Sequence, residues 1–201
     1  MAHDDDTRGR ILNEAEAMIR FQGLAGLSLS PLADRVGIRK PSLFHHFRDK
    51  HSLTRAVVER YSTRFFSRLD AIVDGSAAPR TRLRRVSDLY EQGLLEPDGP
   101  QGQVGICLCA ALSGDLDELD ERSRTAVRAF FEGVESRLSR LLEVGRAEGQ
   151  FALDGSPATT ARALVAALEG AHLSARVHGD TSVFRRIARL AESGLAGTGR
   201  S

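Results

Sequence analysis

The segment SLSPLADRVGIRKPSLFHHFRDKHSL, residues 28–53, contains two short helical patterns in succession. In the first of them, SPLADRV, apolar residues recur at the spacing that places them on one side of a helix: Leu32, Ala33 and Val36. Ser30 precedes Pro31, as an N-cap residue precedes a proline at the first helical position, and Ser28 is an alternative N-cap. The sequence therefore predicts a short helix that ends near residue 36.

Gly37 separates this helix from a second one, because glycine readily adopts the left-handed conformation that ends a helix. The second helix carries Leu43 and Phe47 four residues apart and hence on one face. A longer helical pattern starts at Asp49. Two short helices joined by a glycine turn and followed by a longer helix predict a helix-turn-helix motif.

Positive charge is concentrated around this motif, although the whole chain has a formal net charge of only +1. Between residues 35 and 68 the acidic residues are only Asp49 and Glu59, whereas the basic residues are Arg35, Arg39, Lys40, Arg48, Lys50, Arg55, Arg60, Arg64 and Arg68. Such a surface suits the phosphates of nucleic acids, and the second helix of a helix-turn-helix enters the DNA major groove. If Leu43 and Phe47 point inward, the side chains available to DNA are Lys40, Ser42, His45 and His46.

The whole segment resembles the helix-turn-helix signature of the tetracycline-repressor (TetR) family of transcriptional regulators, including the Gly-Ile turn, the Leu-aromatic-x-His-Phe run and the lysine that follows. The resemblance implies a three-helix DNA-binding domain, assigned to residues 1–52. It also implies a larger helical domain that binds a ligand and dimerises, assigned to residues 53–201, with a connecting helix that starts near Asp49. The implied partners are a double-stranded DNA operator, a small-molecule inducer and a second copy of the chain.

The resemblance also implies roles for single residues. Those that would begin the recognition helix, line its DNA face or hold a phosphate are Lys40, Pro41, Ser42, Phe44, His45, His46 and Lys50. Phe44 stands where the family usually has tyrosine, so the hydroxyl that would bond a phosphate is missing. Arg39 stands where a small capping hydroxyl is common and is interpreted as an extra phosphate or guanine contact. Lys40, which precedes Pro41, is a candidate for the cap position.

Helical periodicity extends over almost the whole chain, which predicts an all-α fold. A first helix is expected after the potential cap Thr7 and is expected to end at the glycines of FQGLAG, residues 21–26. After a loop over residues 74–80, we expect helical segments over residues 81–95 and 104–112, interrupted by EPDGPQGQ. A charged helix follows, whose apolar stripe is Val127, Phe130, Phe131, Val134, Leu138, Leu141 and Leu142.

The helix expected over residues 157–177 carries its only charges, Arg162, Glu169 and Arg176, at every seventh position, so they form one narrow stripe. The rest of its surface is apolar or small and has to be covered on two sides. We expect a second copy of the chain to cover one side together with the last helix, which gives a two-fold dimer with a four-helix interface. The expected interface residues are Ala163, Ala167, Gly170, Ala171, Ser174, Phe184, Ile187 and Ala191. The alternative is a central helix buried within one large bundle.

The chain has 201 residues, of which 41% are hydrophobic and 27% charged, enough for one well-buried domain or for a small module attached to a larger one. Its longest apolar run, VGICLCAAL, is half a membrane span, and its N-terminus carries acids where a signal peptide carries bases. We therefore expect a cytoplasmic protein with no membrane partner.

The expected function is a DNA-binding repressor released from its operator by an inducer, with no cofactor, metal or catalytic residue. Candidate walls of the inducer cavity are Tyr90, Cys107, Phe130, Phe131 and His172, the last being either a ligand contact or a core histidine. An alternative is a regulator that senses oxidants or electrophiles through Cys107, as some family members with a cysteine in a similar segment do. Otherwise Cys107 and Cys109 pack as buried thiols. A thiol oxidoreductase is disfavoured, because two residues two apart on one helix diverge by about 200°.

Overall fold

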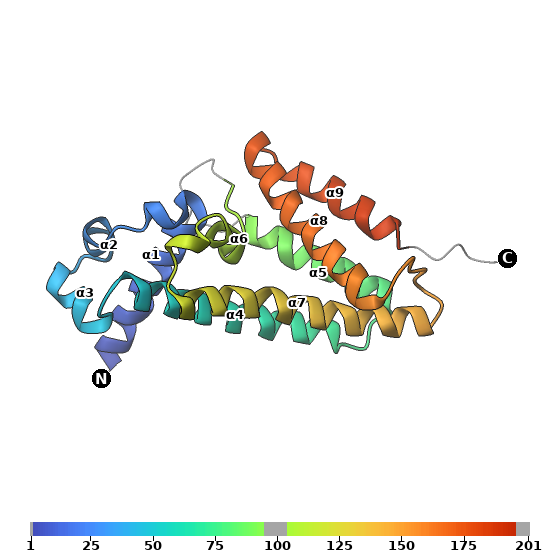
Figure 1. Cartoon of the computed structure of the whole chain (residues 1–201), viewed down its shortest axis with the longest axis horizontal. Coiled ribbons are helices and arrows are strands. Elements are labelled where there is room, and N and C mark those ends of the chain that lie inside the picture. Colours follow the sequence, from blue (N-terminus) through green and yellow to red (C-terminus); the bar gives the residue numbers. More distant parts are fainter. Residues whose placement is uncertain (1, 95–103, 196–201) are drawn as a thin grey trace. The chain divides into compact units, whose positions relative to one another are not determined.

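The computed structural model of the chain describes residues 2–94 and 104–195 (Figure 1). These residues form α-helices and one short 3₁₀ helix, and no β-strand occurs among them. The predicted all-α fold is therefore confirmed. The helices group into two compact units, one of residues 2–63 and 108–129, the other of residues 64–94, 104–107 and 130–195. The long helices α4 (Lys50–Val73) and α7 (Glu121–Ala147) contribute to both units, and the domain boundary at residue 52 stays a prediction.

The first unit begins with α1 (Ala2–Gly26). This helix starts before Thr7, so the prediction that Thr7 is its N-cap was wrong. At Gly23 the backbone leaves the helical conformation, with φ 73° and ψ −178°. The helical run is thus kinked within the glycine-containing stretch where the sequence predicted its end.

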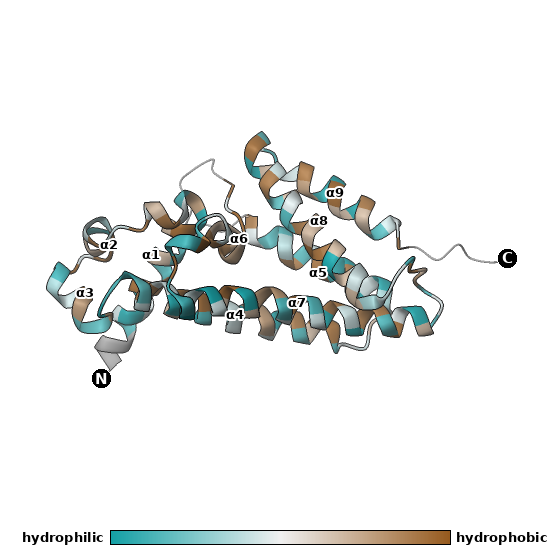
Figure 2. Cartoon of the chain, in the orientation of Figure 1, coloured by the Kyte–Doolittle hydropathy of each residue, from teal (hydrophilic) through white to brown (hydrophobic). Residues whose placement is uncertain are grey.

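The short helix α6 (Leu108–Ser113) packs against α1 and buries Leu108, Cys109 and Leu112. Figure 2 shows how apolar this helix is. The backbone N–H of Leu24 donates a hydrogen bond to Asp115 Oδ2 (3.0 Å), between α6 and the 3₁₀ helix η1 (Leu116–Glu118). Residues 104–107 are not helical, so Cys107 precedes α6 and the expectation that both cysteines share one helix was wrong. The expected break at residues 96–103 lies outside the described residues.

In the second unit, α5 (Pro79–Leu94), α8 (Pro157–His178) and α9 (Thr181–Ser193) pack against one another. Ser156 caps α8 by accepting a hydrogen bond from the backbone N–H of Thr159 (3.1 Å). Gly179, in the left-handed conformation, ends α8, and α9 follows after one further residue. The predicted apolar stripe of α7 is buried except at Phe131, which is half-buried. Among the described residues, no helix has both the length and the apolar character needed to cross a bilayer.

Candidate nucleic-acid interface and inner sites

Two short helices of the first unit, α2 (Leu29–Val36) and α3 (Lys40–His46), form the predicted helix-turn-helix. Ser28 occupies the N-cap position of α2 but makes no side-chain capping bond. The prediction of Ser30 as the N-cap was therefore wrong, and the alternative prediction, Ser28, gave the right position. The apolar side of α2 is buried as predicted. Gly37 has φ 73°, and its N–H donates to the carbonyl oxygen of Asp34 (3.1 Å). The glycine turn between the two helices is therefore built as the sequence predicts.

The helix α3 is anchored on one side and open on the other. Leu43 and Phe47, the inward pair predicted from the sequence, are 0% and 4% exposed. Arg39 holds the N-cap position in an extended conformation without a side-chain capping bond, so Lys40 is the first helical residue and not the cap. The predicted DNA-contacting residues on the open side are exposed, with His46 half-buried: Arg39, Lys40, Pro41, Ser42, Phe44, His45 and His46.

Lys50 is placed differently from the other predicted DNA contacts. It is half-buried at the start of α4, and its Nζ donates a hydrogen bond to the carbonyl oxygen of Leu24 (2.9 Å). Just before it, Asp49 Oδ1 accepts from the backbone N–H of Ser52 (2.7 Å), and Ser52 Oγ accepts from the N–H of Asp49 (3.1 Å). The bonds from Ser52 hold the pKa of the Asp49 carboxyl below its ordinary value. This capped junction fixes the place where α3 gives way to α4.

Part of the positive charge in the basic segment is used inside the protein. Arg60 on α4 donates to the carbonyl oxygen of Gly9 (3.1 Å) and lies 3.8 Å from Glu16, which is 4% exposed. Arg55 lies 3.7 Å from Glu59 on the same helix. By contrast, the side chain of Arg48, next to α3, is 93% exposed, and within the described residues its one ion pair is with its neighbour Asp49 (3.4 Å). The sequence alone does not distinguish arginines that are paired inside the protein from arginines that are exposed to solvent.

The second unit brings most of the predicted inducer-binding residues into one aromatic cluster. Phe65, which the sequence analysis did not select, has its ring centroid 5.3 Å from that of Tyr90 and 5.2 Å from that of Phe130. Phe130 lies 5.6 Å from Phe131, and Tyr90 lies 5.5 Å from His172. Tyr90, Phe130 and His172 are almost fully buried. Four of the five predicted residues are thus linked through Phe65; the fifth, Cys107, is 2% exposed and lies just before α6.

His172 forms a buried polar group with Glu169, one turn earlier on α8. His172 Nε2 lies 2.9 Å from the carbonyl oxygen of Tyr90, which can only accept, so Nε2 carries a proton. The other ring nitrogen, Nδ1, lies 3.5 Å from Glu169 Oε2. Glu169 is 9% exposed, and its oxygens make no hydrogen bond to the residues that the structure describes. Within the same residues, no group of three or more His, Cys, Asp or Glu side chains is placed to hold a metal ion.

The predicted dimer residues divide into exposed and buried positions. Ala163 and Gly170 are exposed and Ala167, Ser174, Ile187 and Ala191 are half-buried, whereas Ala171 and Phe184 lie in the core of the chain's own second unit. Three large apolar residues that the sequence analysis left out are exposed on the same helices: Leu173 (51%), Val177 (81%) and Leu190 (74%). The spacing of Ala163, Gly170, Leu173 and Val177 on α8 already indicates one continuous face.

A helix-turn-helix with an exposed basic recognition helix, joined to a second helical unit, defines a DNA-binding transcriptional regulator. Comparison with known families agrees. Residues 11–57 match the bacterial regulatory proteins of the tetR family, and residues 79–191 match the tetracyclin repressor-like C-terminal domain. The chain therefore belongs to the TetR family.

Individual relatives give the same assignment. The chain is 30% identical to the HTH-type transcriptional repressor NemR of Escherichia coli, over 87% of this chain and 86% of NemR. It is also 30% identical to the transcriptional regulator AcuR of Cereibacter sphaeroides, over 85% of this chain and 82% of AcuR. A TetR-family regulator from Agrobacterium tumefaciens superposes with a TM-score of 0.89 at 28% identity and covers 96% of this chain and 99% of its own. The reduced form of E. coli NemR superposes with a TM-score of 0.83 at 26% identity, with the same coverage.

Proposed function

We propose that the chain is a repressor that binds a two-fold symmetric operator as a homodimer and leaves it when a small molecule binds the second unit. The observation that carries the proposal is the one-sided burial of α3. Leu43 and Phe47 fix the helix from within, while Lys40, Ser42 and His45 stay in solvent. A regulator of this kind acts on bacterial DNA in the cytoplasm, and we propose no enzymatic activity for it.

The exposed side of α3 is proposed to enter the major groove. His45 lies in the exposed row and is proposed to reach base edges, while Lys40 and Arg39 at the helix start hold phosphates. Pro41, Ser42, Phe44 and His46 complete the proposed contact surface. Lys50 is also proposed to contact a phosphate. In the free chain its Nζ donates a hydrogen bond to the carbonyl oxygen of Leu24.

Selection of bound duplexes from a random pool, followed by titration of the enriched sequence, tests this assignment. We expect Lys40→Ala to weaken binding on all sequences and to lower the salt slope by about one ion, as loss of a phosphate contact does. His45→Ala should change the preference among operator variants, because it removes a base contact. Arg85→Ala on α5, which lies outside the helix-turn-helix, is the control for loss of one positive charge. A pool without an enriched sequence would contradict the proposal.

The inducer is proposed to bind at the aromatic cluster of the second unit, where Tyr90, Phe130, Phe131 and His172 meet around Phe65. Aromatic walls with a few polar groups are typical of small-molecule sites in proteins. The buried Glu169 carboxylate and His172 Nδ1 supply such polar groups, since neither makes a hydrogen bond with the described residues. Cys107 is included as a further proposed wall.

A second candidate function is control by thiol chemistry at Cys107. Its support is the position of Cys107 directly before α6 and the likeness to NemR, whose solved structure is that of a reduced form. If Cys107 is the sensor, an alkylating electrophile should release the protein from its operator, Cys107→Ser should abolish the response and Cys109→Ser should not. Cys109, 0% exposed on α6, serves as the matched buried thiol. Retention on the operator with Cys107 alkylated would leave the non-covalent inducer as the only signal.

A further inference from the structure

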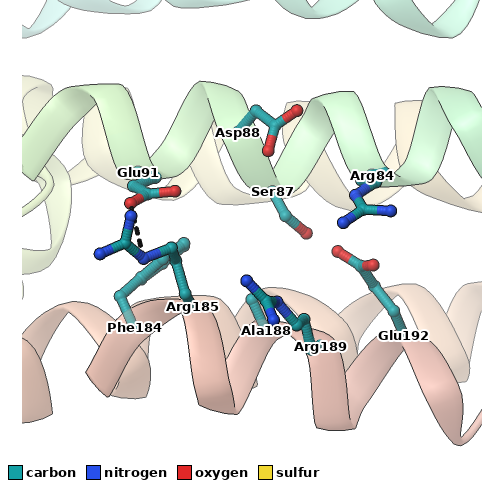
Figure 3. Close-up of a pocket in the computed structure, with 9 residues that line it drawn as sticks. All are labelled: Arg84, Ser87, Asp88, Glu91, Phe184, Arg185, Ala188, Arg189 and Glu192. Atoms are coloured by element: carbon teal, nitrogen blue, oxygen red, sulfur yellow. Dashed lines mark ion pairs between the residues drawn. The ribbon is translucent and has the colours of Figure 1, made fainter. Parts of the chain in front are cut away.

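A pocket lies between α5 and α9 of the second unit (Figure 3). Its volume is about 60 Å³, and it adjoins an open groove of about 490 Å³ with which it shares Arg84, Arg189 and Glu192. None of the residues assigned above to the inducer, DNA or thiol functions lines either space. One proposed dimer residue, Phe184, does line the pocket, from the core of the unit. The pocket therefore has no role in the functions proposed so far.

The charged walls of the pocket follow from the spacing of two helices. On α5, Arg84, Ser87 and Glu91 share one face, and on α9 Arg185 and Arg189 share the face opposite (Figure 3). Arg185 Nε lies 3.4 Å from Glu91 Oε1 and closes one end. Arg84 and Arg189 have no ion pair with any residue in the described ranges. Figure 3 shows the Glu192 carboxylate directed toward both guanidinium groups, but it forms no ion pair with either of them, so both can still bind a ligand.

Ser87 gives independent support for a ligand. The residue is 5% exposed, and its Oγ makes no hydrogen bond within the described part of the chain. Figure 3 shows the hydroxyl directed toward α9, between Arg84 and Arg189. A buried hydroxyl without a partner destabilises the folded chain, so its presence needs an explanation. A ligand atom that accepts the Ser87 proton supplies one.

The unpaired charges that line the pocket between α5 and α9 favour a bound anion. Arg84 and Arg189, with Arg80 in the adjoining groove, outnumber Glu192. Asp88 also lines the pocket, but Figure 3 shows its carboxylate farther from α9 than the Ser87 hydroxyl, and it lines a separate groove beside Arg85 as well. A guanidinium presents a planar fork of donors that matches a carboxylate. The volume of about 60 Å³ exceeds the roughly 10–15 Å³ that a cavity needs to hold one water molecule, and it has room for that group.

We infer that this pocket is a second ligand site, which takes the carboxylate group of a small organic acid. Arg84 and Arg189 bind the carboxylate and Ser87 donates to it, while the organic body lies in the adjoining groove beside Leu83 and Phe151. Glu192 disfavours doubly charged anions such as phosphate, because the second negative charge is repelled at close range. The inference does not depend on DNA binding or on the inducer site.

Isothermal titration of the full chain with benzoate tests the site. Saturable binding of benzoate is expected, with little or no binding of benzamide, which has the same shape and no charge. Arg84→Gln and Arg189→Gln should each weaken benzoate binding by about tenfold or more, as expected for loss of a charge-assisted hydrogen bond. Arg85→Gln is the matched control, because Arg85 is the next residue on α5 and faces a different groove. Equal binding of benzamide, or an equal loss in Arg85→Gln, would overturn the inference.

Two further variants separate a ligand contact from a structural role. Ser87→Ala should weaken benzoate binding without lowering the melting temperature, since the hydroxyl has no partner to lose in the free chain. Glu192→Gln should strengthen benzoate binding and allow inorganic phosphate to compete with it. Phosphate that displaces benzoate from the unchanged protein at equal concentration would show a general anion site and overturn the carboxylate assignment.

Discussion

At the scale of single residues, one carboxylate holds the junction that presents α3. Asp49 accepts from the backbone N–H of Ser52 and caps α4, and its pKa is lowered by these bonds. A lowered pKa in the folded state means that folding favours the ionised carboxylate. Ionised Asp49 therefore stabilises the folded chain at pH values above 3.8, the ordinary pKa of an aspartate. That contribution is lost as the pH falls through the lowered pKa, because the protonated carboxyl is a weaker acceptor.

We expect Asp49→Asn to be less stable than the unchanged chain at neutral pH, and the difference to disappear in acid. Asparagine keeps an oxygen acceptor at the cap but does not titrate. Urea denaturation followed by far-ultraviolet circular dichroism at a series of pH values measures this, since the chain contains no tryptophan. Subtracting the pH dependence of the unfolding free energy of Asp49→Asn from that of the unchanged chain cancels the contributions of other carboxyls with a lowered pKa, such as Asp70 and Asp120. A difference that is the same at every pH would refute the linkage.

At the scale of the helix, the sequence predicts positions well where the local chemistry has one solution. Gly37 ends α2 and Leu43 anchors α3 as expected, because a left-handed turn and a four-residue apolar spacing each allow few structures. The sequence predicts helix ends poorly where two or more capping signals lie close together. Thr7 resembles a cap, yet α1 already begins at Ala2, and Ser28 and Ser30 are equally good caps on chemistry alone. The contact of His172 with the Tyr90 carbonyl and the cluster around Phe65 depend on contacts between helices that are distant in the sequence, which local spacing does not contain.

A close approach between elements limits substitution at the end of α7. A Cβ at Gly145 would collide with the ring of Phe151 and lie 3.0 Å from Pro79 Cβ at the start of α5. We expect Gly145→Ala to destabilise the chain by about 1–3 kcal/mol through overpacking, although alanine is favoured in a helix by about 1 kcal/mol. Gly9→Ala in α1, where nothing lies within 4 Å of the new Cβ, should be neutral or stabilising. Equal free energies of unfolding in the two variants would contradict the overpacking argument.

At the scale of the whole molecule, the last two helices leave an apolar surface in solvent. Leu173 and Val177 on α8 and Leu190 on α9 are more than half exposed, and the small residues Ala163 and Gly170 of α8 are exposed as well. Single exposed apolar residues are common on proteins, but large apolar residues that share one exposed helix face, as Leu173 and Val177 do four residues apart on α8, mark an interaction surface. The sequence predicted a dimer face from the small residues of α8, and that face stays a prediction. The large residues that would supply most of the buried apolar area were recognised only from their exposure.

Gly170→Arg tests whether this face forms the proposed dimer. No atom lies within 4 Å of a Cβ at Gly170, so the single chain can accept the arginine, and the helix gains propensity. In a dimer the same arginine would be an uncompensated charge in an apolar interface, at a cost of about 3 kcal/mol or more, which is over about a hundredfold in the dissociation constant. We expect sedimentation to show a monomer with an unchanged circular dichroism spectrum.

Operator binding should be lost as well, because one recognition helix makes too few contacts alone. Gly155→Arg, in the open loop before α8, adds the same charge outside the face and should remain dimeric. If Gly170→Arg sediments as a dimer, the interface lies elsewhere on the molecule.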